Sequence, residues 1–311
     1  MKTLLIDGNN AVWRCAMKMP ELTTPRGENI QVVYGVIRLL RDMIDRFEPN
    51  QVIVCWDEGV PAYRLSIYPN YKQHRERHRM ESTEKAKENR KKVLKQMSTL
   101  KEILPLLGVK QVSHPNTEGD DLIGTAAQMK RLGMRIIISG DKDMFQLVKK
   151  GVRVWNPNHL RLYKHSNFEK IMEITPAQYA DIQILTGDMQ GDGIPPAAKG
   201  LGDKTAKELI QKYGSLVALF QKPHRKKIKK MGSRYAKLYK KGVREQILVN
   251  WKLTDLITVN NQKALETLIK LQAEKKVKVD PHKVRQAFMN KAFVSLLKDF
   301  GAWILPFQNL S

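Results

Sequence analysis

After Met1, the chain begins with KTLLIDGNN (residues 2–10), a short apolar segment that ends in an acid and a turn. QVIVCWD (51–57) and MRIIISGDKD (134–143) have the same design, and residues 110–113 form a fourth strand-like segment ahead of an acidic cluster. Parallel strands end along one edge of their sheet. The sequence therefore predicts one pocket that gathers seven carboxylates: Asp7, Asp57, Glu118, Asp120, Asp121, Asp141 and Asp143.

Neighbouring carboxylates resist ionising together unless cations lie between them, and hard Mg²⁺ or Mn²⁺ ions prefer oxygen ligands. The pattern thus predicts a site for two or more divalent ions. Each acid also has an ordinary structural interpretation. A single Asp after a strand often caps a helix or turn, as Asp143 can, and Glu118 with Asp121 can favour a helix dipole. The coincidence of four acidic strand ends favours the metal site.

Composition indicates the substrate class. The 311 residues include 55 Lys and Arg against 31 Asp and Glu, a net charge of +24, which attracts polyanions such as nucleic acid. Nucleic acid is the favoured partner, and a ribosome-associated or merely basic soluble protein is the alternative that charge alone leaves open. Cys15 and Cys55 lie in apolar surroundings, which excludes a disulfide framework and favours a reducing compartment. No apolar run reaches about 18 residues, so we expect a soluble, cytoplasmic protein without a membrane segment.

The order of elements predicts an α/β fold with a mostly parallel central sheet flanked by helices. Asn9 or Asn10 is the expected cap of a helix from Ala11. Further helices are expected at 30–47, 120–132 and 142–149, and a hairpin at 152–155 and 160–163. Beyond Pro176 only helices are expected, at 177–186, 205–213, 216–220, 234–250 and 262–274. We predict a core of residues 1–186 and a helical subdomain of residues 187–311.

The segment from about residue 72 to 101 carries eleven Lys or Arg and four Glu, with few apolar residues before Val93. Such a helical stretch is polar on most faces at its start and amphipathic at its end. It is expected to project from the body before docking back. A charged, solvated helix without further function is the alternative.

Five ordered blocks resemble the motifs of the flap endonuclease and 5′-3′ exonuclease superfamily: LLIDGNN, VCWDEGVPAYRLSIYPNYKQHR, TEGDDLIGTAA, ISGDKDMFQLV and LTGDMQGDGIPPAAKGLGDKTAKELI. The resemblance covers about residues 1 to 215. Within the superfamily, the blocks resemble those of bacteriophage 5′ nucleases and of the 5′-nuclease domain of bacterial DNA polymerase I. It implies a PIN-like 5′-nuclease fold in which residues 72–101 form a helical arch and residues 187–311 include a helix-hairpin-helix type motif.

The resemblance also implies a function. The expected activity is metal-dependent hydrolysis of phosphodiesters near 5′ ends and junctions of branched DNA, extending to RNA primers on DNA. The expected enzyme is a monomer in the cytoplasm of a bacterial or phage-infected cell. Two alternatives stay open: a catalytically weak DNA-junction binding protein of the same fold, and a broader metal-dependent ribonuclease.

Individual roles follow from the matching positions. The first metal set is Asp7, Glu118, Asp120 and Asp121, with Asp141 and Asp143 bridging toward a second ion and Asp57 acting through water or orienting the network. Asp188 and Asp192 supply a further pair. Relatives separate these two aspartates by two residues, whereas three intervene here. Asp188 is the expected ligand, and Asp192 is expected to bind metal directly, act through water or cap a turn.

Lys72 and Arg75 resemble the family's basic pair at the base of the arch, with an electrostatic task at the scissile phosphate. The alternative is that both are ordinary solvated residues. Arg64 is expected either to contact phosphate or to structure its loop. Tyr71 is expected either to stack on a base or to pack beneath the arch.

Gly200-Leu201-Gly202-Asp203-Lys204-Thr205 resembles the hairpin of a helix-hairpin-helix motif, where glycines let the backbone approach a phosphate. In relatives such a hairpin holds a monovalent cation, so K⁺ is expected here. Residues 222–244 contain eleven Lys or Arg and no acid, including Lys226, Lys227 and Lys230. This run is expected to contact duplex backbone, or else to be solvated surface. Residues 261–311 show helical apolar spacing and no chemical role.

Overall fold

The computed structural model describes residues 1–310, leaving aside the side chains at positions 76, 79 and 234. Its centre is a six-stranded sheet in the order β3-β2-β1-β4-β5-β6, in which only β6 is antiparallel to its neighbour. The strands are β1 (Lys2–Asp7), β2 (Gln51–Cys55), β3 (Lys110–Val112), β4 (Met134–Ile138), β5 (Val152–Asn156) and β6 (Arg161–Tyr163). The predicted mostly parallel α/β fold and the β5–β6 hairpin are confirmed.

Both faces of the sheet are buried, as the nearly continuous apolar strands require. In β1, Leu4 and Ile6 belong to one hydrophobic cluster, whereas Leu5 belongs to the other. The first cluster is covered by α1 (Gly8–Lys18), α2 (Gln31–Phe47) and the inner end of α5 (Glu84–Ile103). The second is covered by α6 (Gly119–Gln128) and by short helices around it: η2 (Lys130–Leu132), η3 (Lys142–Leu147) and α7 (Phe168–Met172).

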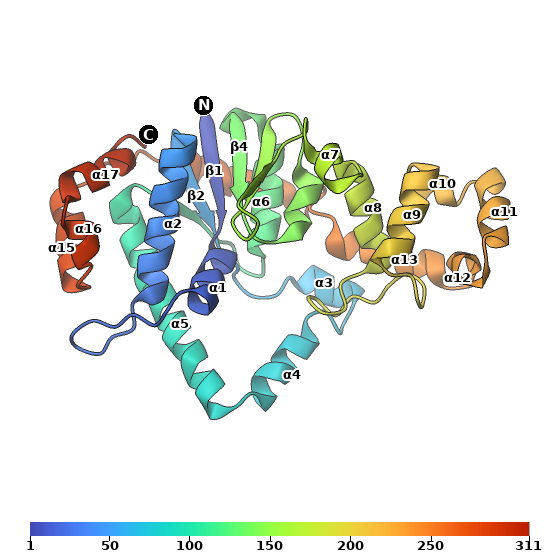
Figure 1. Ribbon diagram of the computed structural model, residues 1–311, viewed down its shortest axis with the longest axis horizontal. Helices are drawn as coiled ribbons and strands as arrows, with labels where there is room; N and C mark the ends of the chain where they lie inside the picture. The colour runs from blue at the N-terminus through green and yellow to red at the C-terminus, as the bar shows by residue number, and fades with distance from the viewer. Residues whose placement is uncertain (311) are drawn as a thin grey trace.

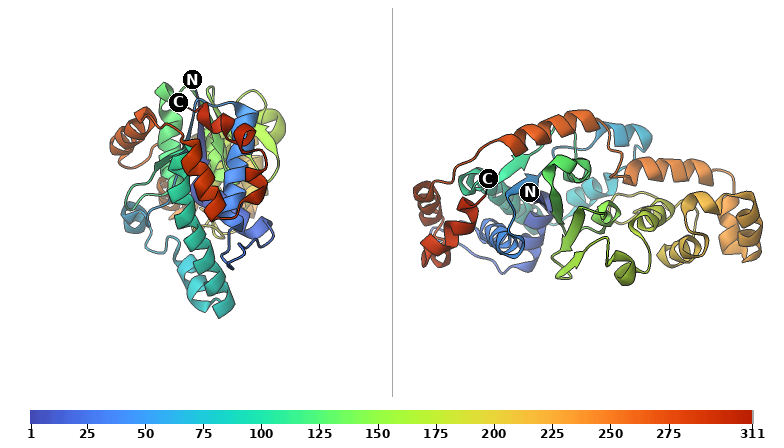
Figure 2. Two further views of the ribbon diagram at one scale, coloured as in Figure 1. Left: turned by 90° about the vertical axis from the view of Figure 1, so that its left-hand side faces the viewer. Right: turned by 90° about the horizontal axis from the view of Figure 1, so that it is seen from above.

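The predicted arch is a pair of helices, α4 (Gln73–Glu81) and α5, joined by a turn at Ser82 and Thr83. They form a V that projects from the body below α1 and α3 (Ala62–Ile67) (Figures 1 and 2). Thr83 accepts a hydrogen bond from the amide of Ala86 and so caps α5. The root of α5 buries Val93 and Leu100 against the core before η1 (Leu104–Leu107) leads to β3.

A separate hydrophobic cluster builds the helical lobe at the right of Figure 1. Its helices are α8 (Pro176–Thr186), α9 (Asp203–Tyr213), α10 (Leu216–Leu219), α11 (Lys222–Lys230), α12 (Ser233–Ala236), η4 (Lys237–Tyr239) and α13 (Val243–Thr254). The single helix expected at 234–250 is wrong. Gly242, with φ of +86°, takes the left-handed conformation between η4 and α13 and divides the segment.

The last fifty residues return from the lobe to the sheet. Helix α14 (Gln262–Glu274) lies against α6 and β3, and α17 (Phe300–Gln308) lies against α2. Between them, α15 (Pro281–Asn290) and α16 (Val294–Leu297) contribute Phe288 and Leu296 to the first sheet cluster. The predicted domain boundary at 186/187 stays a prediction. Side chains beyond residue 255 belong to both clusters that pack on the sheet, so the chain after residue 186 does not lie entirely in the helical lobe.

None of the helices in residues 1–310 combines the length and apolar character that crossing a membrane needs.

The contact between α6 and the segment that follows α13 leaves no room for a side chain at Gly124. A Cβ at this position would lie 2.3 Å from the carbonyl oxygen of Leu256. Gly124→Ala should therefore destabilise the protein by about 1–3 kcal/mol in urea unfolding, because the helix must shift. The control is Gly301→Ala in α17, where an added Cβ would meet no described atom within 4 Å apart from its chain neighbours and its own helix backbone. This change should be neutral or slightly stabilising. Equal midpoints for the two variants would contradict the packing.

Candidate active site

The carboxyl ends of the parallel strands open into a cavity of about 850 Å³. Five of the seven strand-end acids line it, namely Asp7, Asp57, Asp120, Asp141 and Asp143. Asp188 and Asp192 reach it from the loop after α8, and Lys72, Arg75 and Arg90 reach it from the arch. The structure therefore brings most of the predicted acids together, in a cavity that the arch borders on one side.

Hydrogen bonds across the strand ends orient these acids. Asp7 ends β1 and caps α1, since its Oδ1 accepts from the amide of Asn10 at 2.9 Å. Its Oδ2 accepts from the Ser139 hydroxyl at 2.8 Å. The prediction that Asn9 or Asn10 caps this helix is wrong, because the acid itself is the cap.

The two asparagines link neighbouring strand ends instead. Asn9 Oδ1 accepts from the amide of Asp57 at 3.2 Å, and Asn10 Oδ1 accepts from the amide of Gly140 at 2.9 Å. Both side chains line the acidic cavity, and neither was assigned a site role from the sequence. Their position two and three residues after Asp7 was the available signal.

Other backbone amides and side chains hold the remaining acids. Asp57 Oδ1 accepts from the amide of Gly119 at 2.7 Å, which ties the end of β2 to the start of α6. Asp141 caps η3 by accepting from the amide of Asp143 at 2.9 Å, and the side chain of Gln183 donates to Asp143. Gln183 is a further site residue that sequence reasoning missed, because α8 approaches the sheet only in the tertiary structure.

The acids of this cavity resist ionisation. Burial raises the pKa of Asp7 to about 7, with Asp57 and Asp141 adding to the rise. Burial and the neighbouring Asp141, Asp192 and Asp188 raise the pKa of Asp143 to about 8. The pKa of Asp120 is raised well above its ordinary value by desolvation and by Asp7 and Asp141. A divalent cation relieves both effects, the burial of negative charge and the repulsion between neighbouring acids.

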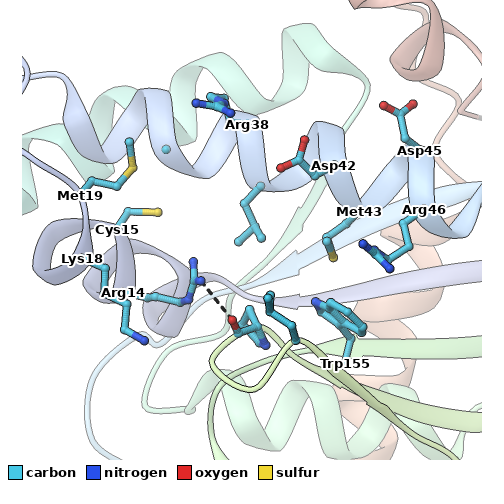
Figure 3. A pocket seen from close by; sticks show the side chains of 14 residues that line it. Arg14, Cys15, Lys18, Met19, Arg38, Asp42, Met43, Asp45, Arg46 and Trp155 are labelled. Atoms are coloured by element: carbon cyan, nitrogen blue, oxygen red, sulfur yellow. Dashed lines mark hydrogen bonds between the residues drawn. The ribbon is translucent and has the colours of Figure 1, made fainter.

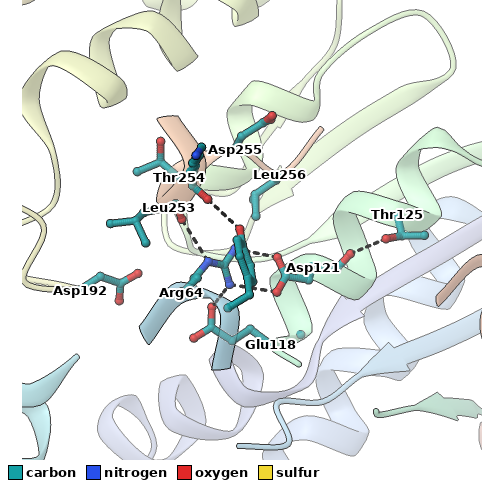
Figure 4. A network of polar contacts seen from close by, with 12 residues as sticks. Arg64, Glu118, Asp121, Thr125, Asp192, Leu253, Thr254, Asp255 and Leu256 are labelled. Carbon is teal, nitrogen blue, oxygen red and sulfur yellow. Dashed lines mark hydrogen bonds and ion pairs between the residues drawn. The ribbon is translucent and has the colours of Figure 1, made fainter. Parts of the chain in front are cut away.

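Glu118 and Asp121 lie in a separate network around Arg64 (Figure 4). The Arg64 guanidinium donates from Nη2 to Asp121 Oδ1 at 2.7 Å and from Nη1 to Asp121 Oδ2 at 2.9 Å, and it also pairs with Glu118. Its Nε donates to the carbonyl of Leu253 at the end of α13. Burial alone would lower the pKa of Arg64, but Asp121 and Glu118 outweigh it and raise the pKa.

Three predicted site residues lie outside the acidic cavity. Arg64 is 2% exposed, which supports the interpretation that it structures its loop, and its contact with DNA stays a prediction. Glu118 and Asp121 pair with Arg64 and do not line the acidic cavity, so their role as ligands of the first metal also stays a prediction. The physical reason is that α3 places Arg64 beside the first turn of α6. More than fifty residues separate the two helices in the sequence, so local patterns do not reveal this contact.

Tyr71 also belongs to this buried network. It is 2% exposed, and its hydroxyl lies 3.0 Å from Glu118 Oε2 and 3.0 Å from Asp192 Oδ2. These contacts support packing beneath the arch, and the predicted contact of Tyr71 with DNA stays a prediction. Thr205, near the start of α9, is also buried, and its predicted contact with DNA stays a prediction.

The basic pair at the arch base faces acids. Lys72 Nζ lies 2.6 Å from Glu118 Oε1, and Arg75 Nη2 lies 2.7 Å from Asp192 Oδ1. Burial would lower the pKa of Lys72, but Asp192 and Glu118 raise it, so its ammonium group stays charged. Both basic side chains also line the acidic cavity. They can therefore reach a phosphate there by exchanging partners.

The donor set fits a divalent ion that keeps much of its water. Among residues 1–310 no three His, Cys, Asp or Glu side chains already converge as a metal-binding group. The acids instead line one cavity, where burial and, to a smaller extent, the neighbouring acids raise the pKa values of Asp7 and Asp143. Mg²⁺ is commonly held by one or two carboxylates and several waters, which suits this spacing. Asp7, Asp120, Asp141, Asp143 and Asp188 remain the candidate ligands.

A second cavity, of about 760 Å³, lies between α1, α2 and the β5–β6 hairpin (Figure 3). Arg46 stacks there over the ring of Trp155, with the guanidinium carbon 4.7 Å from the centroid. Among its described lining residues none belongs to the predicted site. The chemistry therefore concentrates in the acidic cavity.

Removing Arg64 should lower the free energy of unfolding, because the buried carboxylates of Glu118 and Asp121 lose their partner. Arg64→Leu is expected to destabilise the protein by roughly 3–5 kcal/mol in urea unfolding. The matched control is Arg131→Leu, which breaks an ion pair to Glu274 whose side chains are 47% and 52% exposed. That loss should stay below about 1 kcal/mol. A similar cost for both changes would contradict the buried network.

Stability should depend on pH through the acidic cavity. Folded pKa values of about 7 for Asp7 and about 8 for Asp143 exceed the ordinary 3.8, so their protonated forms favour folding. This stability is present below about pH 4 and is lost as the pH rises through about 8. In EDTA the melting temperature should therefore fall between about pH 5 and pH 8, and Mg²⁺ should reverse the fall increasingly at higher pH.

Asp143→Asn is the control for this pH dependence. The variant should lose part of both the pH-dependent fall and the Mg²⁺ effect. If Mg²⁺ raised the melting temperature of the wild type by the same amount at pH 5.5 and at pH 8, the result would count against ionisation of these acids on metal binding.

The sequence of this chain is similar to those of known proteins. Residues 2–174 match the family described as 5'-3' exonuclease, N-terminal resolvase-like domain, and residues 174–285 match 5'-3' exonuclease, C-terminal SAM fold. The chain is 29% identical to a 5'-3' exonuclease of Aquifex aeolicus, with 96% of this chain and 95% of that protein covered. It is 30% identical to the thermostable DNA polymerase I of Thermus aquaticus over 96% of this chain, but it spans only 33% of that polymerase.

A solved structure of the bacteriophage T5 D15 flap endonuclease, a pseudo-enzyme-product complex with DNA and metal ions, has a similar fold. The TM-score is 0.68 at 16% identity, with 95% of this chain and 99% of that chain covered. At this identity the likeness shows the fold alone. The family match is independent of it and spans more than half of the chain, from the first strand to the start of the helical lobe. The chain therefore belongs to the 5'-3' exonuclease family.

Proposed function

We propose that this chain is a structure-specific 5′ nuclease, acting as flap endonuclease and 5′-3′ exonuclease on branched or 5′-ended DNA. The observation that carries the proposal is a single cavity where strand-end acids face basic residues of the arch. Phosphodiester hydrolysis needs both: acids that gather cations, and positive side chains that hold the phosphate. Family membership supports the same reaction class.

Mg²⁺ or Mn²⁺ would be held by Asp7, Asp120, Asp141, Asp143 and Asp188. Bound divalent ions, about 3.5–4 Å apart in two-metal enzymes, supply an activated water and stabilise the leaving oxygen. Asp57 is exposed at the cavity mouth and is fixed by the amide of Gly119, which suits a role through water. Lys72 and Arg75 would hold the scissile phosphate.

The arch supports entry of a single-stranded 5′ end. Arg90, Leu94 and Met97 of α5 line the acidic cavity. Arg90 lies over the ring of Trp13, with its guanidinium carbon 5.2 Å from the centroid. Positive charge and few exposed aromatics favour contact with backbone over recognition of base sequence.

The helical lobe supports duplex binding. Lys226, Lys227 and Lys230 are exposed on α11, while Ile228 on its other side is buried in the lobe. Gly200, with φ of +83°, and Gly202 expose their backbone just before α9, and Lys204 is exposed in its first turn. We propose that both surfaces contact duplex phosphates and that backbone oxygens of the Gly200–Gly202 hairpin bind K⁺.

The finer substrate range is part of the same proposal. RNA primers paired with DNA would be cleaved by the same site, because it contacts phosphate and reads no base edge. The described residues of one chain line the whole cavity, so we propose that the enzyme acts as a monomer. We also propose that it acts in the cytoplasm. The division into a core of residues 1–186 and a subdomain of residues 187–311 is proposed as the separation of cleavage from duplex binding. Within that subdomain, the helical lobe carries the duplex contacts, because the residues beyond 255 pack on the sheet.

The test is cleavage of end-labelled 5′-flap, nicked duplex, single-stranded DNA and RNA–DNA hybrid, with Mg²⁺ or EDTA. The wild-type protein should cut the flap and the nicked duplex only with Mg²⁺. Asp120→Ala should lower kcat by at least about 10²–10³-fold, because an acid beside the reacting phosphate is lost. Flap binding in Ca²⁺ should change little.

Asp299→Ala is the matched control, since Asp299 is exposed at the start of α17 and far from the cavity in the fold. It should cleave like the wild type. Flap binding without any cleavage would favour the junction-binding protein. Preferential cleavage of single-stranded RNA would favour the ribonuclease.

A further inference from the structure

The loop from Asp188 to Gly193 is bonded to the base of the arch through both backbone and side chains. The amide of Lys72 donates to the carbonyl of Asp192 at 2.9 Å, and Arg75 Nε donates to the carbonyl of Gly191 at 2.6 Å. His74 Nε2 lies 3.1 Å from the carbonyl of Gln190. Three consecutive carbonyls of the loop thus meet the first turn of α4.

The carboxylate of Asp192 completes this contact. Its Oδ1 lies 2.7 Å from Arg75 Nη2 and 3.5 Å from Lys72 Nζ, and its Oδ2 lies 3.0 Å from the Tyr71 hydroxyl. Asp192 is therefore bonded to the two residues that would hold the scissile phosphate. We name residues 188–193, with these contacts, the arch latch.

The loop's own conformation presents Asp192 to the arch. Asp188 Oδ1 accepts from the amide of Gly191 at 2.9 Å, and the amide of Asp192 donates to the carbonyl of Asp188 at 3.1 Å. These bonds close a turn over the three residues that separate the two aspartates. Gly193 then leaves with φ of +75°, and a Cβ there would lie 3.1 Å from His74 Nδ1.

The two basic residues differ in how firmly they are held. Lys72 and Glu118 are 17% and 7% exposed, so their pair is shielded from water. Arg75 is 43% exposed and Asp192 is 18% exposed, so water weakens their attraction. An incoming phosphate therefore displaces Asp192 from Arg75 more readily than it displaces Glu118 from Lys72.

We propose that Asp192 is a positioning residue that holds the arch base in the DNA-free protein and releases Arg75 to the substrate phosphate. The arch latch then opens when substrate arrives, which couples the arrangement of the arch to the occupancy of the site. The part of this proposal that concerns phosphate rests on the proposed function. The latch in the free protein stands on the contacts alone.

The first measurement needs neither DNA nor metal. Hydrogen exchange is followed in peptides covering residues 70–81 of the metal-free protein. Asp192→Asn keeps the size of the side chain but removes its charge, so exchange in the arch base should become about three- to tenfold faster. Asp188→Asn keeps its acceptor for the amide of Gly191, and it should leave arch exchange at the wild-type rate. Equal exchange in Asp192→Asn and wild type overturns the proposal.

The second measurement is flap-DNA binding in Ca²⁺ across a salt series. Asp192→Asn should bind about three- to tenfold more tightly, because Arg75 no longer has to give up a partner. The gain should vanish in the Arg75→Ala background. Binding that is unchanged or weaker in Asp192→Asn, or a gain that persists without Arg75, overturns the exchange of partners.

The two proposals fail in different ways. Faster exchange in Asp192→Asn supports the latch even if the wild type cleaves no flap, a result that would instead remove the proposed function. Wild-type cleavage with unchanged exchange would leave the nuclease standing and remove the latch.

Discussion

Mutual repulsion among carboxylates at one edge of a parallel sheet is the constraint on which this structure depends. The topology delivers Asp7, Asp57 and Asp141 to the same edge, because β1, β2 and β4 are neighbours that run in one direction. Burial makes that repulsion stronger, since little water remains to screen it. The protein offsets part of it with amide donors and neutral side chains, and the remainder makes the cavity receptive to cations.

The acids are divided between two environments with different roles. Glu118 and Asp121 are neutralised by Arg64 and form a rigid joint between α3, α6 and the end of α13. Asp120, between them in sequence, points from the same helix turn into the cavity. Successive residues of a helix face different directions, so one short acidic segment serves both structure and chemistry. This joint also connects the helical lobe to the acidic edge.

The base of the arch likewise holds charged side chains, here positive ones, in defined positions. Lys72 adopts φ of +59°, an uncommon backbone conformation for a residue with a side chain, at the point where the chain turns into α4. The turn is held by Tyr71 beneath it and by the loop after α8 beside it. Lys72 and Arg75 are thus held in place before substrate binds. A phosphate that binds them must replace their ion pairs with Glu118 and Asp192.

Local pattern was enough to predict the parallel sheet, the hairpin, the arch and the acids that follow Leu4–Ile6 and Ile136–Ile138, because apolar periodicity and strand-end position are properties of short segments. Pairings between distant segments could not be predicted that way. The burial of Arg64 and Tyr71, the separation of Glu118 and Asp121 from the cavity, and the return of α14 to the sheet all depend on packing across more than forty residues. Side-chain partners are chosen by which helices meet, and only the folded chain decides that.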